Sequence, residues 1–581
     1  MPSPISLSLK EHIASLFASA LGQIAPDRVG EPILLERPKS PEHGDFACNL
    51  AMQLAKPLKR RPREIAQSIV AGLPASPLVD RVEVAGAGFV NVFLRVDAKR
   101  SVLKQIFEQG DAYGRIAYGA GQRVQVEFVS ANPTGPLHVG HGRGAAYGAS
   151  LANVLAAAGF EVQREYYVND AGRQMDILAL STWLRYLEMQ HVVVPFPPNA
   201  YQGDYVREMA ASIAAAHGKR YVRSAEEVLR GVPAVEQDPE GHLDALIANA
   251  KHVLGEDYSY LHDFALNEQL GDCRNDLQEF GVSFDNWFSE HSLFVGGHVE
   301  RALEKLERSG HVYIQDGAKW FRSTSFGDEK DRVVQRENGQ YTYFASDIAY
   351  HLNKFERGFD RVIDVWGADH HGYIARVKGA LVALGIDAER LTVALVQFAV
   401  LYRGGKKASM STRSGDFVTL RELRQEVGND AARFFYVLRK SDQHLDFDLD
   451  LAKSQSTDNP VYYVQYAHAR ICSVLEEWGG EDVQLRDVSL DALDSAQEMS
   501  LLRQLIDFPE VIEDAARDLA PHLIAFYLKD LAANFHSYYN SVRFLVEEVE
   551  VRDARLALIL GIGQVLSSGL TLLGVSAPRK M

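Results

Sequence analysis

Apolar residues recur with a helical period at the start of the chain. Leu9, Ile13, Leu16, Phe17 and Leu21 follow this spacing and predict an amphipathic helix near residues 7–21. Two more helices are predicted around Phe46–Leu58 and near residues 62–73. Strand patterns follow at Val82–Val84 and Phe89–Leu94, with glycines between them. Residues 1–115 are therefore predicted to form a small α/β domain.

The pattern changes in the middle of the chain. A β-branched run at Val124–Val129 leads into a turn rich in proline and glycine, and then into an alanine-rich helical stretch. A second strand pattern at Glu161–Val168 completes a β-α-β unit, which is typical of a Rossmann-type nucleotide-binding domain. Parallel-strand patterns return at Arg361–Val365 and Thr392–Leu401. We therefore predict a Rossmann-type domain over residues 116–400, interrupted by a polar helical insertion at about 175–295.

The last part of the chain is predicted to be helical. A connecting segment over residues 401–455 precedes a purely helical pattern at 456–581, whose apolar and aromatic stripe indicates a packed bundle. The predicted fold class is thus multidomain α/β plus all-α. The N-terminal helix carries Lys10 and Glu11, unlike a signal peptide, and we find no uninterrupted apolar stretch long enough to span a bilayer. We expect a cytoplasmic protein with no membrane partner.

Composition adds limits to this picture. A chain of 581 residues exceeds one hydrophobic core, so three or four domains are expected. The net charge of −16 argues weakly against a polyanionic partner. The charge is uneven, because residues 1–115 hold 15 basic and 12 acidic residues whereas residues 456–581 hold 10 and 19. The three cysteines are far apart in sequence, so neither a zinc motif nor a disulfide framework is predicted.

The clearest chemical motif is His138-Val139-Gly140-His141, at the start of the helix in the β-α-β unit. Histidines three residues apart share one face of a helix, whose N-terminus presents backbone N–H groups and the positive dipole end. Gly140 leaves room for a base or ribose against the backbone. These features suit a nucleoside triphosphate whose α-phosphate gains charge during attack. Four residues alone are a weak signal, and chance is the alternative.

A second motif, Trp366-Gly367-Ala368-Asp369-His370-His371, follows an apolar strand. It is therefore expected at the carboxyl edge of the sheet, where ligands bind in such domains. Asp369 could accept hydrogen bonds from ribose hydroxyls. A metal site is the alternative, but no fourth ligand is apparent and none is predicted.

The wider context of these motifs resembles class I aminoacyl-tRNA synthetases, and their arginine-specific family in particular. His138–His141 resembles the HIGH signature of that class. The resemblance extends along the chain to the segments Glu127–Gly135, Tyr166–Gly172, His43–Phe46, Leu573–Val575 and Ala577-Pro578. It implies activation of L-arginine with ATP and transfer of the arginyl group to arginine tRNA. Mg²⁺ is implied by the chemistry of ATP rather than by a ligand motif.

The resemblance also implies roles for individual residues. Tyr343 and Asp347 are four residues apart, on one helical face, and are expected at the arginine side chain, where a guanidinium needs a carboxylate and an aromatic ring. Glu127 and Asn132 are expected at the substrate α-ammonium. The expected ATP-binding residues are His138, Gly140, His141, Gly367, Asp369, His370, Met410 and Ser411.

One segment departs from the family pattern. Ser409–Gly415 resembles the KMSKS loop, but Ser409 and Thr412 stand where that loop has lysines. Pyrophosphate still needs a cation, and Lys406, Lys407 and Arg413 are the candidates. We favour Lys407 slightly, because it is nearer to the loop. The alternative is that both lysines are solvated surface residues.

Transfer RNA contacts are predicted in both terminal domains. The basic cluster containing Lys59, Arg60 and Arg61 is a candidate for phosphate contacts, although most charge runs are solvated helix faces. The acidic helical region resembles an anticodon-binding bundle that reads bases by stacking, with Tyr538 as a candidate.

The alternatives are a non-catalytic tRNA-binding relative and another class I synthetase. The absence of zinc-ligand cysteines argues against a cysteinyl enzyme. The intact motif histidines and Asp369 argue against a non-catalytic relative. We expect a monomer.

Overall fold

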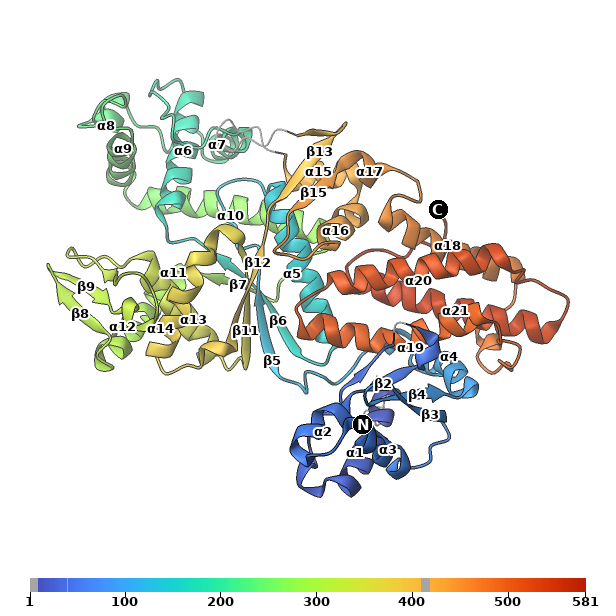
Figure 1. Ribbon diagram of the computed structural model, residues 1–581. Helices are drawn as coiled ribbons and strands as arrows, with labels where there is room; N and C mark the ends of the chain where they lie inside the picture. Colours follow the sequence, from blue (N-terminus) through green and yellow to red (C-terminus); the bar gives the residue numbers. More distant parts are fainter. Residues whose placement is uncertain (1–8, 39, 409–417) are drawn as a thin grey trace.

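The computed structural model describes residues 9–38, 40–408 and 418–581. Figure 1 shows an N-terminal domain beside a helical bundle, with a central sheet joining them to a helical insertion. The N-terminal domain and the insertion have hydrophobic cores of their own, whereas the C-terminal helices share a core with the central sheet.

The N-terminal domain packs three helices on an antiparallel sheet with the order β1-β2-β4-β3. Their bounds are α1 (Leu9–Ile24), α2 (Leu50–Leu58), α3 (Pro62–Gly72), β1 (Leu35–Glu36), β2 (Phe46–Cys48), β3 (Val79–Ala85) and β4 (Phe89–Leu94). The helix expected at Phe46–Leu58 is wrong in its first part. Phe46 pairs with Val92 of β4, and its strand lies in the core, so the helix begins only at Leu50. The next helix, α4 (Val96–Gln109), packs against the C-terminal bundle instead.

The central sheet has five parallel strands in the order β12-β11-β5-β6-β7. They are β5 (Arg123–Glu127), β6 (Glu161–Val168), β7 (Asn286–Ser289), β11 (Arg361–Gly367) and β12 (Leu391–Val396), and α5 (Val139–Ala157) connects β5 to β6. Because β6 lies on one side of β5 and β11 on the other, the strand order reverses beside β5. A ligand crevice is expected at the carboxyl ends of strands at such a reversal.

The strand expected at Thr392–Leu401 is two strands. The first, β12, ends at Val396. After two residues the chain enters a second sheet with the order β14-β13-β15, formed by β13 (Ala399–Arg403), β14 (Lys406–Lys407) and β15 (Leu445–Asp448). The polypeptide thus leaves the parallel sheet at Gln397 and Phe398.

The insertion has a hydrophobic core of its own, around Trp183, Tyr186 and Leu246. Its helices are α6 (Arg173–Met189), α7 (Asp204–His217), α8 (Ala225–Leu229), α9 (Pro239–Leu254) and α10 (Glu256–Glu279). The predicted end of the helical insertion at about residue 295 is wrong, because β7 pairs with β6 and belongs to the central sheet. A smaller unit follows, with an antiparallel sheet in the order β10-β9-β8. It contains β8 (Val312–Gln315), β9 (Ala318–Phe321), β10 (Arg332–Gln335), α11 (His291–Val295), α12 (His298–Arg308), α13 (Tyr343–Glu356) and α14 (Ile374–Ala383).

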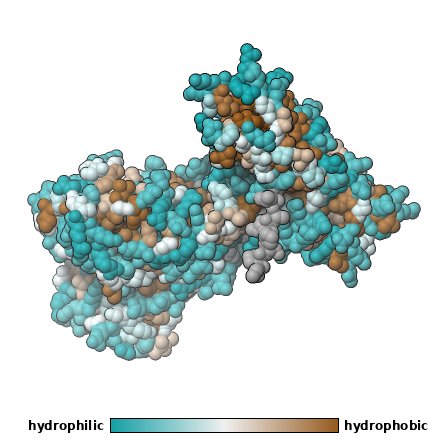
Figure 2. Space-filling model, turned by 90° about the horizontal axis from the view of Figure 1, so that it is seen from below, coloured by the Kyte–Doolittle hydropathy of each residue, from teal (hydrophilic) through white to brown (hydrophobic). Residues whose placement is uncertain are grey.

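The C-terminal region is helical, and its core is continuous with that of the central domain. The helices are α15 (Leu420–Val427), α16 (Asn429–Val437), α17 (Leu449–Lys453), α18 (Pro460–Trp478), α19 (Ala496–Arg517), α20 (His522–Ser541) and α21 (Val549–Leu572). Of the helices in the described residues, α21 alone is long and apolar enough to cross a membrane. It packs against α18, α19 and α20, so its apolar surface serves the bundle core. Hydrophilic side chains dominate the face shown in Figure 2.

Candidate active site

The histidine pair lies at the N-terminus of α5, beyond the end of β5. His138 is the N-cap residue, and its Nδ1 accepts a hydrogen bond from the Gly140 N–H at 3.1 Å. His141 Nδ1 accepts from the His138 N–H at 3.3 Å, and the two rings stack with centroids 3.7 Å apart. An imidazole whose Nδ1 accepts carries its proton on Nε2. Both histidines therefore offer an Nε2–H donor.

Burial keeps this pair uncharged. It lowers the pKa of His141 to about 3, with a smaller contribution from His138, and it also lowers the pKa of His138. Both rings are consequently neutral hydrogen-bond donors at pH 7. Donors of this kind can stabilise negative charge that develops on a phosphate.

The backbone at this helix start differs from the sequence expectation. The Val139 N–H donates to Val418 O at 3.1 Å, and the His141 N–H donates to His138 O at 2.9 Å. The Gly140 N–H is taken by His138. The first three N–H groups of this helix are therefore already bonded, to His138 and to the segment that contains Val418. The described structure presents the imidazoles as the donors.

A cavity of about 200 Å³ lies farther along the same sheet edge, at the ends of β5 and β11. Its lining is aromatic and acidic: Glu127, Tyr167, Asp347, Tyr350, His351, Trp366, His370 and Tyr373. The Asp347 carboxylate accepts a hydrogen bond from the Tyr373 hydroxyl. Burial raises the pKa of Asp347, although this hydroxyl opposes the shift. A cavity with aromatic walls and carboxylates is suited to a cationic side chain.

The other residues predicted for this side lie around the cavity. Tyr343 begins α13 and is 64% exposed, outside the cavity wall. A Cβ built on Gly172 would lie 3.8 Å from its hydroxyl, so Tyr343 stands beside the segment that precedes α6. Asn132 is exposed, and its Oδ1 accepts from Asn169 Nδ2 at 3.2 Å.

Beneath the cavity lies a buried ionic network that sequence reasoning missed. The Lys354 ammonium is fully buried and contacts Glu127 Oε2 at 2.5 Å and Asp364 Oδ1 at 2.7 Å. His351 Nε2 binds the other oxygen of Asp364 at 2.8 Å. Burial alone would raise the pKa of Asp364, but Lys354 and His351 hold it well below its ordinary value. The Lys354 ammonium also offsets part of the negative charge of Glu127. A signal for this network existed, because Asp364 interrupts the apolar run of a buried strand.

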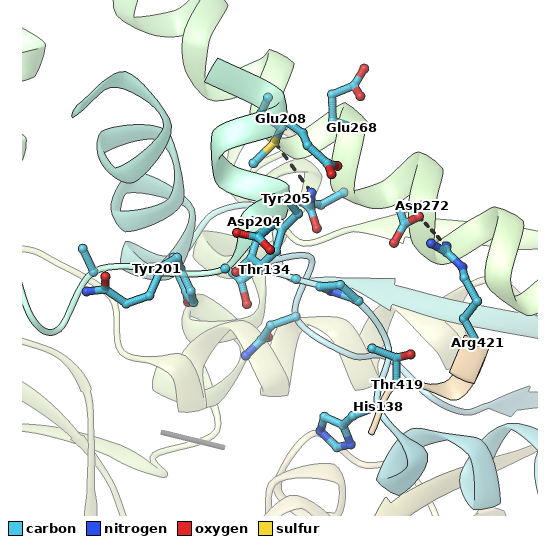
Figure 3. Close-up of a pocket in the computed structure, with 18 of the residues that line it drawn as sticks. Thr134, His138, Tyr201, Asp204, Tyr205, Glu208, Glu268, Asp272, Thr419 and Arg421 are labelled. Carbon is cyan, nitrogen blue, oxygen red and sulfur yellow. Dashed lines mark hydrogen bonds and ion pairs between the residues drawn. The ribbon is translucent and has the colours of Figure 1, made fainter. Parts of the chain in front are cut away.

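A larger cavity of about 960 Å³ separates the histidine pair from the insertion. Figure 3 shows the insertion side of this cavity above, with Tyr201, Asp204, Tyr205 and Glu208, and the opposite side below, with His138 and Thr419. The Tyr205 hydroxyl donates to Thr134 O at 2.7 Å, which ties the insertion to the turn before the histidines. The acidic wall does not suit phosphates, so this cavity is electrostatically favourable for them only near its histidine side.

The Trp366–His371 motif is partly exposed to solvent. Asp369 and His370 have side chains that are each 62% exposed. A Cβ built on Gly367 would lie only 2.4 Å from Asp369 Oδ1, so Asp369 folds back over the Gly367 backbone. His370 lines the smaller cavity. Among residues 9–38, 40–408 and 418–581, no group of three His, Cys, Asp or Glu side chains could hold a metal ion.

The candidate cations occupy a hairpin. Lys406 and Lys407, here called the hairpin lysines, form β14 and are exposed. They pair with Arg403 and Tyr402 of β13, respectively. Met410, Ser411 and Arg413 lie outside the described residues.

Comparison with known proteins identifies the family. The arginyl tRNA synthetase N terminal domain matches residues 11–94, the class I (R) catalytic domain matches 102–208 and 270–448, and the DALR anticodon binding domain matches 464–581. An arginine–tRNA ligase of Nitrosospira multiformis is 66% identical over 581 residues, covering 100% of both chains. The chain belongs to the arginyl-tRNA synthetase family.

Other relatives agree with this assignment. An arginine–tRNA ligase of Aromatoleum aromaticum is 65% identical over 588 residues, covering 99% of this chain and 100% of the relative. The fold is shared with the arginyl-tRNA synthetase of Thermus thermophilus, with a TM-score of 0.74 at 24% identity, covering 99% and 100% of the two chains. The fold class expected from the sequence is confirmed.

The candidate tRNA contacts of this synthetase divide into two groups. Lys59, Arg60 and Arg61 are exposed in the turn between α2 and α3, where Lys59 adopts a left-handed conformation. They are available to a phosphate backbone. Tyr538 is a wrong candidate for base stacking, because it is fully buried and its hydroxyl donates to Glu498 Oε1 at 2.6 Å.

Proposed function

We propose that this protein activates L-arginine with ATP and transfers the arginyl group to arginine tRNA. The observation that carries the proposal is a carboxylate-lined cavity and a neutral histidine pair on one sheet edge, in a chain that belongs to the arginyl-tRNA synthetase family. The proposal includes a cytoplasmic location and a monomeric state.

The reaction has two balanced steps. An oxygen of the arginine carboxylate attacks the α-phosphorus of ATP, the bond to the bridging oxygen of the β-phosphate breaks, and pyrophosphate leaves. The terminal adenosine 2′-hydroxyl of tRNA then attacks the arginyl carbonyl carbon, loses its proton, and displaces AMP. Mg²⁺ enters with ATP as part of the substrate.

The residues take the following roles in the proposal. Nε2–H groups of His138 and His141 stabilise charge on the α-phosphate. Asp347 accepts hydrogen bonds from the guanidinium, and Tyr343 closes over the side chain. Glu127 and Asn132 face the α-ammonium, with Glu127 shared between the substrate and Lys354.

Nucleotide and tRNA contacts complete the proposal. Gly140 lies against the nucleoside, Asp369 and Gly367 bind the ribose, and His370 lies between the two substrates. The basic turn formed by Lys59, Arg60 and Arg61 contacts tRNA phosphates.

One hairpin lysine compensates for the altered loop in this proposal. Along β13, Ala399 and Leu401 are buried while Val400 and Tyr402 alternate with them. Lys407 is opposite Tyr402, on the strand face away from those buried residues. Lys406 is opposite Arg403, whose guanidinium binds Glu426 at 2.6 Å. The proposal takes Lys407 as the cation for pyrophosphate because it is the nearer of the two lysines to the altered loop.

ATP–pyrophosphate exchange tests the function. The assay supplies each amino acid in turn, with and without tRNA, and then measures tRNA charging. Of the amino acids tested, only arginine should support exchange. Of the tRNAs, only arginine tRNA should be charged. Exchange with another amino acid, or tRNA binding without any exchange, would favour the alternative functions.

A further inference from the structure

A buried tyrosine of α16 contacts the backbone between the two motif histidines. The Tyr436 side chain is almost fully buried, and its hydroxyl donates to Val139 O at 2.9 Å. A Cβ built on Gly142 would lie 2.9 Å from both Cε2 and the hydroxyl oxygen of Tyr436, so the ring packs directly on the first turn of α5. The Val139 N–H is also bonded, to Val418 O at 3.1 Å. Val139 is therefore held through both its N–H and its carbonyl.

The orientation of the histidine rings depends on this stretch of backbone. His138 and His141 each accept a hydrogen bond from the main chain of residues 138–140. The bond to His141 is long at 3.3 Å, outside the usual range for an N–H donor. Local contacts alone therefore fix the imidazoles weakly, and the contacts that hold Val139 add to them.

The same helix is anchored at a second point. Arg433 precedes Tyr436 by three residues, shares its face of α16 and is almost fully buried. Its guanidinium donates to Leu573 O at 3.0 Å, just after α21, and to Phe280 O at 3.0 Å and Gly281 O at 3.1 Å, just after α10. Burying a guanidinium is costly unless its donors are satisfied, so these carbonyls hold α16 in place.

The start of α16 is bonded to the C-terminal bundle. Asp430 accepts from the Ser576 N–H at 3.0 Å, from the Ser576 hydroxyl, and from Gln465 Nε2 of α18 at 2.8 Å. Gly574 has a φ of +67°, and a Cβ built on it would lie 2.3 Å from Arg433 Nη2. The guanidinium thus lies against a backbone that has no room for a side chain. Residues 573–576 and α18 together determine where α16 lies.

We propose that Tyr436 is a positioning residue for the histidine pair, and that α16 holds it there from the C-terminal bundle. The contacts form one series. The bundle holds Asp430 and Arg433, α16 connects them to Tyr436, and Tyr436 holds Val139 between the histidines. Donors that stabilise charge in a transition state must be placed within a fraction of an ångström, so this series acts on the rate of activation.

Removing one hydroxyl tests the contact with the histidine motif. Tyr436→Phe keeps the ring against α5 but takes the donor from Val139. With arginine tRNA present, single-turnover release of pyrophosphate should slow about tenfold. A misplacement of 1 Å can cost about 100-fold, and the retained ring limits the shift. Calorimetric affinities for arginine and for Mg·ATP should stay within about twofold, because the rings act mainly in the transition state.

Tyr113→Phe is the matched control. The Tyr113 side chain is buried, and its hydroxyl donates to Leu505 O of α19 at 2.7 Å, so the same kind of bond is lost without contact with the histidine motif. Both variants should lose similar thermal stability, but Tyr113→Phe should keep the wild-type rate. Equal rates in the two variants would overturn the positioning role of Tyr436.

A histidine-free background separates positioning from general damage. In His138→Ala/His141→Ala, the further change Tyr436→Phe should slow pyrophosphate release less than about twofold, because there are no rings left to position. General damage to α5 or to the sheet would slow both backgrounds by the same factor, and that result would overturn the proposal.

The anchor of α16 is tested with Arg433→Lys, which keeps the charge but cannot reproduce the fork geometry of the guanidinium. It should slow activation in the wild type and add little to the loss in Tyr436→Phe, since both changes act along one series of contacts. Asp430→Asn, at the half-buried start of α16, tests the same anchor if Arg433→Lys does not fold. Additive losses would overturn the role of α16.

This inference rests on the proposed function, but the two can fail separately. If the wild type lacks arginine-dependent release of pyrophosphate, the proposed function is wrong. If the wild type is active and Tyr436→Phe is as fast as Tyr113→Phe, only the positioning role is wrong.

Discussion

Replacing Asp347 with asparagine should weaken arginine binding selectively. Asp347 lies in the cavity of about 200 Å³ and already accepts a hydrogen bond from the Tyr373 hydroxyl. An ionised carboxylate has about four acceptor sites, so it can bind Tyr373 and still accept two hydrogen bonds from a guanidinium. The asparagine amide has one acceptor oxygen. If Tyr373 keeps that oxygen, the amide nitrogen faces the guanidinium, donor against donor.

The expected size of the effect follows from these contacts. A hydrogen bond to a charged group contributes about 1.5–3 kcal/mol, and two are lost or weakened in a partly desolvated site. We expect a net cost of about 2–4 kcal/mol, or about 30- to 1000-fold in the dissociation constant for arginine. ATP affinity should change little, because the carboxylate lies on the arginine side of the sheet edge.

Calorimetric titration with arginine and with ATP measures both quantities in the same preparation. Tyr373→Phe is the matched control. It removes the hydroxyl but leaves the carboxylate, so it should cost arginine affinity much less than Asp347→Asn does. Normal arginine affinity combined with weak ATP binding would refute the reasoning and assign Asp347 to the nucleotide.

Three further predictions concern the charged groups around the site. His138→Ala and His141→Ala should each lower single-turnover adenylate formation about 100-fold, about 3 kcal/mol, with little change in arginine affinity; a raised KM at unchanged kcat would contradict this role. Lys407→Ala should slow activation about tenfold, and adding Thr412→Lys should restore the rate. A wild-type rate with both Lys406 and Lys407 replaced would show that neither hairpin lysine neutralises pyrophosphate. Lys354→Met should lower stability by about 3–5 kcal/mol near pH 7, because two buried carboxylates lose their cation. Without the cation, the pKa values of these carboxylates should rise in the folded variant above their values in the unfolded chain. The folded variant then binds protons more readily, so thermal unfolding should show a smaller loss of stability relative to the wild type at pH 5 than at pH 8.

Periodic patterns and turn residues predicted most of the fold. The β-α-β unit, the insertion and the helical end of the chain each carry a local signal that needs no tertiary information. The errors fall where tertiary contacts decide. Phe46–Cys48 has an apolar run compatible with a helix or a strand, and it becomes a strand because β1 and β4 pair with it on both sides. The break after Val396 has no strong turn residue. Instead, Arg143 donates to Gln397 O and the Gln397 N–H donates to Ser441 O, and these hydrogen bonds hold the connection.

The site was predictable where a motif carries its chemistry and not where packing does. The histidine pair and Asp347 belong to recognisable segments. The Lys354 network joins α13 to β5 and β11, whose residues are up to 227 positions apart, so only the folded chain brings them together. Tyr538 failed for the opposite reason. Its place in a helical stripe could not show which aromatic residues face the core, and Tyr538 is buried while Phe526 on the same helix is exposed.

The distribution of charge along the sheet edge bears on how the reaction begins. A carboxylate must attack a polyphosphate, so two anions have to approach each other. In the described structure the cavity of Asp347 and Glu127 is acidic, whereas the histidine pair is neutral, and the acidic wall of the larger cavity lies on the insertion side, across from the histidines. If the guanidinium and the α-ammonium of the substrate arginine bind at this acidic cavity, the substrate carboxylate would point toward the histidine pair. Lys354 limits the negative charge of that end, because it neutralises Asp364 and part of Glu127. The cavity therefore keeps an acidic character while Asp364 and part of Glu127 are paired with a cation. In the proposed reaction, this arrangement would favour attack by orientation as well as by charge.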